Sequence, residues 1–281
     1  MKKILLPTDF SDNAWNAIFT ALKLYADVKC QFYIVHAYEP KAINLLGRKT
    51  QQRLGVIYDS LSQYSEQELE KVIGYLDQNH SNANHRFESI SKSETLEEAI
   101  AEIITELDID LVVMGTQGAS DVKEVFMGSN TVNVLKKVKN CPVLVVPSTY
   151  NFRQLHKVAF PTDFIRTYEK YELMPLTELV SLWKAQIEVL HVGIEFVLND
   201  AQLSNRKNLE HRFSSVNYSY TNVPFEGSVS KSVEKYVLQN EVDFMAMIRH
   251  HHTFWEKVIG APVVKKIAFH SKVPVLMLPE H

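Results

Sequence analysis

Residues 110–147 of the chain read DLVVMGTQGASDVKEVFMGSNTVNVLKKVKNCPVLVVP. Leu111–Met114 and Cys141–Val146 have the length and apolar composition of buried strands. Between them lie a glycine-punctuated loop and an amphipathic helix with Val132, Leu135 and Val138 on its apolar side. The order strand, loop, helix, strand is typical of a parallel α/β sheet.

The glycines of this stretch follow the spacing Gly115-x2-Gly118-x9-Gly128, and Ser129 comes next. Glycine admits positive φ and lets a phosphate approach backbone N–H groups. Gly128 and Ser129 fall where the helix begins, so unpaired N–H groups and the positive end of the helix dipole meet an anion there. The hydroxyls of Ser129 and Thr131 add donors. The pattern therefore predicts a phosphate site.

This spacing, followed by Cys-Pro-Val-Leu-Val-Val, resembles the ATP-binding signature of the universal stress protein family. The opening ILLPTDFS, residues 4–11, is similar to the first strand and acidic loop of that family. The resemblance covers the whole chain because the pattern starts twice. VAFPTDF at 158–164 repeats residues 4–10, and VPVLMLP at 273–279 repeats residues 141–147. A repeat of this length predicts duplication of a whole domain.

We therefore expect an α/β chain of two tandem doubly wound domains, residues 1–149 and 150–281. Each is expected to be a five-stranded parallel sheet with helices on both faces, of the adenine nucleotide alpha hydrolase-like type. Residues 148–156 form the polar linker. Ser11 or Asp12 is expected to cap the first helix, and Thr95 to Glu98 matches a capping box.

The last strands of the two domains are further expected to pair with each other. Single-domain members of the family pair in this way, and here Cys141–Val146 would meet Val273–Leu278 within one chain. The result would be an intramolecular pseudo-dimer, with or without further dimerisation, that covers two sheet edges.

The resemblance implies a nucleotide-binding role for matching positions in the first domain. Asp9 would contact the ribose, the backbone of Val35 would meet the adenine edge, and residues after the fourth strand would line the ribose and phosphates. The full set is Pro7, Thr8, Asp9, Val35, Met114, Gly115, Gln117, Gly118, Gly128, Ser129, Asn130 and Thr131. Structural alternatives stay open: Asp9 as a helix cap, Val35 and Met114 as core, and Gln117 as a turn residue.

The second domain departs from the motif where phosphate would bind. Ala261 and Pro262 follow Gly260, and the first offers no hydroxyl while the second offers no N–H. Arg249 and His250–His252 replace the upstream glycines, so we expect a degenerate copy. The histidines, with or without His270, raise a zinc hypothesis. A polar solvated loop is preferred, because three consecutive histidines point in different directions.

Composition is that of an ordinary globular chain, with 30 basic and 33 acidic residues and a net charge of −3. The absence of a basic stripe argues against nucleic acid as a partner, and no apolar run is long enough to span a membrane. Cys30 and Cys141 are expected to be buried free thiols in a reducing cytoplasm.

The expected function is that of an ATP-binding stress-response protein, with or without Mg²⁺, acting on a protein partner by regulation. No Walker lysine follows the glycines, and no residue is marked as a general base, so it is not expected to be an enzyme beyond slow hydrolysis. The alternative is a scaffold that binds a protein partner or a non-nucleotide ligand. An adenylate-transferring enzyme is disfavoured, because the motifs it needs are missing.

Overall fold

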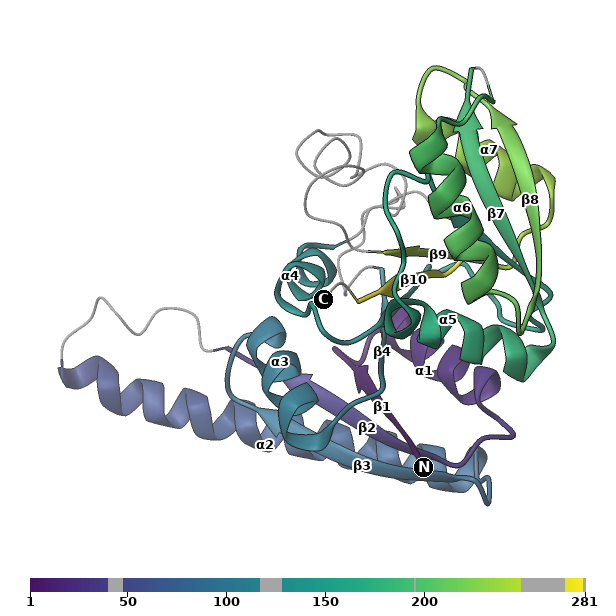
Figure 1. Ribbon diagram of the computed structural model, residues 1–281. Coiled ribbons are helices and arrows are strands. Elements are labelled where there is room, and N and C mark those ends of the chain that lie inside the picture. Colours follow the sequence, from purple (N-terminus) through teal and green to yellow (C-terminus); the bar gives the residue numbers. More distant parts are fainter. Residues whose placement is uncertain (40–47, 117–127, 195, 249–270, 280–281) are drawn as a thin grey trace. The chain divides into compact units, whose positions relative to one another are not determined.

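A computed structural model describes residues 1–39, 48–116, 128–194, 196–248 and 271–279, and for 48–58 only the backbone. The chain divides into two compact units (Figure 1). The described residues up to Cys141 form the first unit, and those from Pro142 onward form the second. The expected α/β fold, with mostly parallel strands and helices on both faces, is confirmed. A domain boundary between 149 and 150 stays a prediction.

The first unit contains four parallel strands in the order β3-β2-β1-β4. They are β1 (Lys2–Pro7), β2 (Cys30–Ala37), β3 (His85–Lys92) and β4 (Leu111–Gly115). In β1, Ile4 lies opposite Phe32 of β2 on one side and Leu111 of β4 on the other. Because the strands are parallel, all of their carboxyl ends lie at one edge of the sheet, which is where ligands bind in doubly wound folds.

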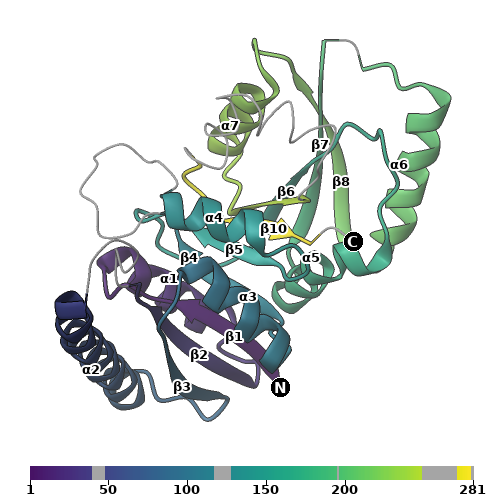
Figure 2. The ribbon, with the colours of Figure 1, turned by 90° about the vertical axis from the view of Figure 1, so that its left-hand side faces the viewer.

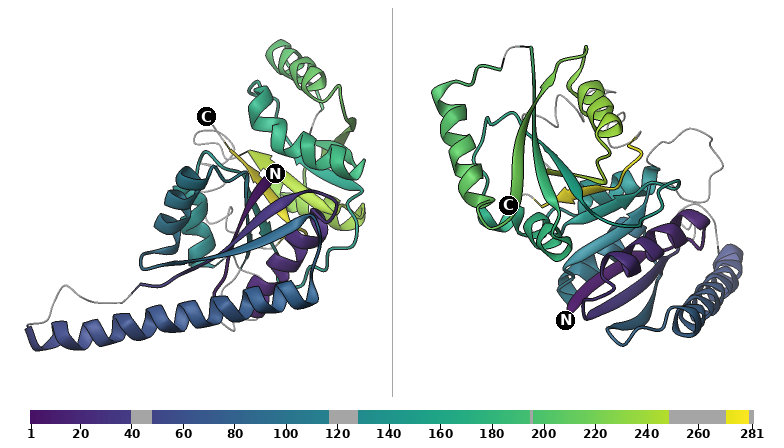
Figure 3. Two further views of the ribbon diagram at one scale, coloured as in Figure 1. Left: turned by 90° about the horizontal axis from the view of Figure 1, so that it is seen from below. Right: turned by 90° about the vertical axis from the view of Figure 1, so that its right-hand side faces the viewer.

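Helices cover both faces of this sheet. They are α1 (Asp12–Leu24), α2 (Arg48–Asn79), α3 (Leu96–Leu107) and α4 (Ser129–Lys137). Figures 2 and 3 show α3 and α4 on one face, with α1 and α2 on the other, as right-handed crossovers require. Ser11 caps α1 by accepting a hydrogen bond from the Ala14 N–H at 3.4 Å, as expected. No helix among the described residues is long and apolar enough to cross a membrane.

The second unit contains five parallel strands in the order β10-β9-β6-β7-β8. They are β6 (Lys157–Pro161), β7 (Gln186–Gly193), β8 (Asn217–Pro224), β9 (Phe244–Ile248) and β10 (Val275–Leu278). The helices are α5 (Lys170–Trp183), α6 (Asp200–Arg212) and α7 (Val229–Gln239). Figure 1 shows α6 and α7 on opposite faces of β7 and β8.

A sixth strand, β5 (Val143–Val146), lies antiparallel to β10 in the second unit, with Val145 opposite Val275. The pairing expected between the two repeated terminal strands is therefore present. Each of the two strands thereby gains a hydrogen-bonded neighbour on one edge.

The segment expected as a polar linker is partly core. Phe152 and Leu155 are 2% and 1% exposed, and the Phe152 ring lies 5.2 Å from the Trp183 ring in an edge-on contact. Both cysteines are buried and free, as expected. Burial raises the pKa of Cys30 to about 11, which keeps the unreactive thiol form at neutral pH.

The duplication extends to individual hydrogen bonds. The backbone N–H of Lys3 donates to Asp110 Oδ2 at 2.7 Å, and that of Lys157 donates to Asp243 Oδ2 at 2.9 Å. Phe10 and Phe164, one in each repeat, both have positive φ, 65° and 55°. Equivalent positions can therefore be compared between the repeats one by one.

Candidate functional site

The loop after β1 is a tight turn braced by its own side chains. Thr8 Oγ1 accepts the Phe10 N–H at 2.9 Å. Asp9 Oδ1 accepts the Ser11 N–H at 3.1 Å and the Ser11 hydroxyl at 2.5 Å. Asp9 nevertheless stays exposed at the carboxyl edge of the sheet. The Asp9 carboxylate thus stabilises the loop, and Asp9 lies at the edge of the sheet where a ligand would bind.

Thr8 also joins this loop to the end of β2. Its N–H donates to the Val35 carbonyl at 2.8 Å, and its own carbonyl lies 2.8 Å from His36 Nδ1. A carbonyl can only accept, so Nδ1 of His36 is the donor in this contact. Val35 and Pro7 lie opposite each other and are buried. Val35 is thereby a core residue whose carbonyl already has one partner.

His36 is a site residue that the motif did not identify. Its ring lies 4.5 Å from the Phe10 ring, in a tilted contact at the base of the loop. The second repeat reproduces the arrangement, because His191 Nδ1 lies 3.3 Å from the Thr162 carbonyl. The sequence signal that could have identified His36 is the presence of a histidine at the same position in both repeats.

The end of β4 approaches the start of α1 closely. A Cβ added to Gly115 would lie 3.1 Å from the Asn13 carbonyl oxygen, so a side chain there would press against the backbone of α1. Met114, 4% exposed, is a core residue. Next to Gly115, Thr116 is 2% exposed, and its hydroxyl has no hydrogen-bond partner among the described residues. A buried hydroxyl without a partner is costly, so this one needs an explanation.

The beginning of α4 is fastened to the end of β4. The Gly128 N–H donates to the Thr116 carbonyl at 2.6 Å, and Thr131 Oγ1 donates to the Gly115 carbonyl at 3.0 Å. Gly128 is the N-cap and brings no side-chain cap, while Ser129 and Asn130 are exposed in the first turn. First-turn N–H groups have no partner within a helix, so they remain available to an anion.

The described part of the chain thus brings most of the expected residues to one edge. One hydrogen bond joins Thr8 to Val35, and others join Thr131 to Gly115 and Gly128 to the adjacent Thr116. Gln117 and Gly118 lie outside the described residues, as do Arg249, His250–His252, Gly260–Pro262 and His270. The role of each residue in nucleotide binding stays a prediction.

The matching loop of the second unit is built alike but carries one extra bond. Thr162 Oγ1 accepts the Phe164 N–H at 3.1 Å, and Asp163 Oδ1 accepts the Ile165 N–H at 3.0 Å. In addition, Thr162 Oγ1 lies 2.6 Å from the hydroxyl of Tyr168, a buried side chain. Burial raises the pKa of Tyr168 to about 12. The loop of the second unit is therefore tied to the residues that lead into α5.

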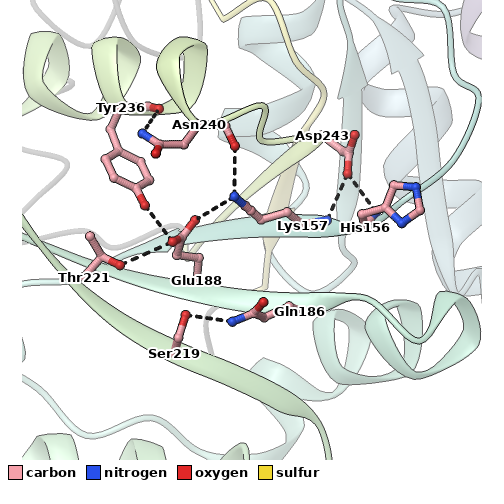
Figure 4. Close-up of polar contacts among 9 residues, drawn as sticks. All are labelled: His156, Lys157, Gln186, Glu188, Ser219, Thr221, Tyr236, Asn240 and Asp243. Atoms are coloured by element: carbon pink, nitrogen blue, oxygen red, sulfur yellow. Dashed lines mark hydrogen bonds and ion pairs between the residues drawn. The ribbon is translucent and has the colours of Figure 1, made fainter.

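A half-buried polar cluster in the second unit lies away from the carboxyl edge (Figure 4). Glu188, near the amino end of β7, accepts the Tyr236 hydroxyl at 2.6 Å and the Thr221 hydroxyl at 3.3 Å. Lys157 Nζ lies 3.8 Å from Glu188 Oε2, an oxygen that has no hydrogen bond. Lys157 Nζ also donates to the Asn240 carbonyl at 2.9 Å. These contacts attach α7 to the sheet. No group of three potential metal ligands occurs among the residues that the structure describes.

Comparisons with known proteins agree with this geometry. The model of the universal stress protein family matches residues 1–147. The universal stress protein MJ0577 of Methanocaldococcus jannaschii is 28% identical over 158 residues, which are 52% of this chain and 94% of that protein. MJ0531 of the same organism, also named a universal stress protein, is 26% identical over 146 residues, 52% of this chain and 81% of the relative.

One solved structure is similar over nearly the whole chain. A universal stress protein from Archaeoglobus fulgidus has a TM-score of 0.67 and 17% identity, with 99% of this chain and 96% of that chain covered. At this identity the likeness concerns the fold, and it extends over both halves of the chain.

Proposed function

Because the chain belongs to the universal stress protein family, we propose that its first unit binds ATP and that nucleotide occupancy regulates a protein interaction in the stress response. The observation that supports this proposal most is the unpartnered hydroxyl of Thr116, buried beside the start of α4. A phosphate or ribose oxygen would complete the hydrogen bonding of this group.

The residues present fit an adenine nucleotide. The uncapped first turn of α4, with Ser129 and Asn130 exposed, offers N–H groups and the positive end of a helix dipole to phosphates. Asp9 offers a carboxylate to sugar hydroxyls, and Thr131 holds α4 against β4 so that these donors keep their places. Pro7 and Met114 are buried near the ends of β1 and β4, where they stabilise the loops that follow these strands. The phosphates would bring negative charge to the first turn of α4, which has no acidic residue of its own.

The proposed role is regulation rather than catalysis. Hydrolysis, if measured, should stay below about 1 per second, the low end of ordinary enzymes. Mg²⁺ would accompany the phosphates through their own oxygens, since no group of three potential metal ligands occurs in the described residues. A cytoplasmic location and a protein partner belong to the same proposal. The second unit, with Ala261 and Pro262 in the motif, would not take nucleotide.

Titration calorimetry of the full chain with ATP tests the proposal. We expect one nucleotide per chain. Asp9→Ala should weaken binding about 10-fold or more, because it removes a hydrogen bond to a charged group. Asp163→Ala is the matched control, since Asp163 makes the equivalent loop bond in the second unit. Two nucleotides per chain, no heat of binding, or equal effects of the two variants would contradict the proposal.

A further inference from the structure

A cavity of about 120 Å³ lies in the second unit at the carboxyl ends of β7 and β8, beside α6. Val189 of β7 and Tyr220 of β8 lie opposite each other in its wall, and so do His191 and Asn222. From α6 come Leu203 and Arg206, one turn apart. The described residues of the wall all lie between 164 and 222, in the second unit, so the cavity is separate from the proposed nucleotide site in the first.

The two repeats differ in this region in the length of the covering helix. In the first unit, the helix between the second and third strands is α2, with 32 residues, and its Tyr64 lies edge-on to Phe10 at 6.1 Å. The corresponding helix α6 has 13 residues. Phe164, the counterpart of Phe10, instead has the ring of Tyr220, from β8, at 6.0 Å. The cavity therefore combines residues shared by both repeats, Phe164 and His191, with residues of α6, a helix much shorter than α2.

The wall is suited to a flat apolar group. The rings of Phe164 and Tyr220 stand on one side, and Leu203 and Phe196 stand at the surface, 43% and 41% exposed. Large apolar side chains left half exposed gain stability when a ligand covers them. A cavity of about 150 Å³ in another protein holds benzene, so the space here corresponds to a single aromatic ring.

Arg206 gives the cavity a fixed positive charge. Its guanidinium lies 4.2 Å from the centre of the Tyr220 ring, and its Nε lies 3.4 Å from Glu210 Oε1. The Tyr220 ring and the Glu210 carboxylate restrain the guanidinium, whose five N–H donors exceed these contacts and leave donors for a ligand. Two parallel N–H groups of this kind match the two oxygens of a carboxylate.

From this arrangement we infer that the cavity of the second unit binds a small aromatic carboxylate, a single ring bearing one acid group. The ring occupies the space between Phe164, Tyr220 and Leu203, and the carboxylate pairs with the terminal nitrogens of Arg206. A tandem chain of this kind holds two different ligands, a nucleotide in one repeat and an organic acid in the other.

Titration calorimetry and saturation-transfer NMR with benzoate test the inference on the full chain. We expect benzoate to bind with a Kd of about 1 mM or lower, which is reasonable for so few atoms. Benzyl alcohol, with the ring but not the charge, should bind at least about 10-fold more weakly, and acetate should not bind. No binding of benzoate at ten times that concentration, or equal binding of benzoate and benzyl alcohol, would overturn the inference.

Variants locate the site. Arg206→Gln should weaken benzoate about 10-fold or more and leave benzyl alcohol unchanged, because only the charged contact is lost. Lys207→Gln removes the same charge from an exposed neighbour on α6 and should change neither probe. Leu203→Trp fills the cavity and should abolish binding of both. Equal effects of the first two variants, or binding that survives Leu203→Trp, would refute the assignment.

One further control separates the two proposals. Asp9→Ala, which changes only the first unit, should leave the benzoate titration unaltered. If it weakened benzoate as much as ATP, the acid would be binding at the nucleotide site and the inference would be wrong. If ATP failed to bind but benzoate still responded to Arg206→Gln, only the proposed function would fall.

Discussion

Thr116→Val should strengthen the fold and weaken the binding of ATP at the same time. The two side chains have the same shape, and the hydroxyl that is lost is buried without a hydrogen-bond partner among the described residues. A buried polar group without a partner costs about 1 to 3 kcal/mol. The free energy of unfolding of the nucleotide-free protein should rise by about this amount. If the hydroxyl serves a phosphate, ATP should bind about 10- to 150-fold more weakly, the value of one hydrogen bond to a charged group.

Thr8→Val is the matched control, since it makes the same change at the same edge of the sheet. The Thr8 hydroxyl accepts the N–H of Phe10, so its loss should lower the free energy of unfolding by about 1 kcal/mol. Urea denaturation without nucleotide and calorimetry with ATP measure the two quantities. If Thr116→Val destabilised the protein as Thr8→Val does, the hydroxyl would already have a partner in the folded chain. The main support for the nucleotide site would then be lost.

Three other changes test the structure itself. Gly115→Ala should destabilise the protein by about 1 to 3 kcal/mol, because the added Cβ would lie 3.1 Å from the Asn13 carbonyl oxygen. Gly74→Ala should stabilise it by about 0.5 to 1 kcal/mol, because Gly74 lies in α2 with open space around it. Urea denaturation measures both changes, and changes of the same sign would contradict the reasoning. The stability of the protein should fall between about pH 10 and 12 by about 2 to 3 kcal/mol through Tyr168. Burial raises the pKa of Tyr168 to about 12, so the unfolded chain loses this proton at a lower pH than the folded chain does. Denaturation curves of Tyr168→Phe should lack this part of the loss of stability. The same dependence of stability on pH in the variant would refute the prediction. Cys30, buried with a raised pKa, should react with a thiol reagent only on unfolding, and rapid labelling of the native protein would exclude the buried position.

The sequence predicted the elements well because their signals are local. Apolar runs marked β4 and β5, and Ser11 marked the start of α1 as the structure has it. At Thr95 the side chain bonds to the Glu98 carboxylate at 3.0 Å rather than to the backbone, so the capping box is present only as a side-chain pair. Sequence spacing fixes which residues approach, but not which atoms they use.

Long-range packing accounts for what the sequence did not predict. In α4 the buried valine is Val134, while Val132 and Leu135 are only half-buried, because Thr131 turns toward β4. Gly115 is predicted as a residue that makes room for a ligand, yet a side chain there would also crowd the backbone at Asn13. Composition and periodicity cannot predict the contact of Thr131 with β4 or that of Gly115 with Asn13, since each depends on how α1 and α4 pack against β4.

The antiparallel pairing of β5 with β10 bears on how the chain folds as it leaves the ribosome. Val145 and Val275 are neighbours in space but are separated by most of the second repeat in sequence, so the partner of β5 emerges only after that repeat has been translated. Until then its free edge can recruit strands from other nascent chains. Premature termination anywhere before β10 would leave that edge bare for good, and such fragments are expected to aggregate even when the repeat ahead of them has folded.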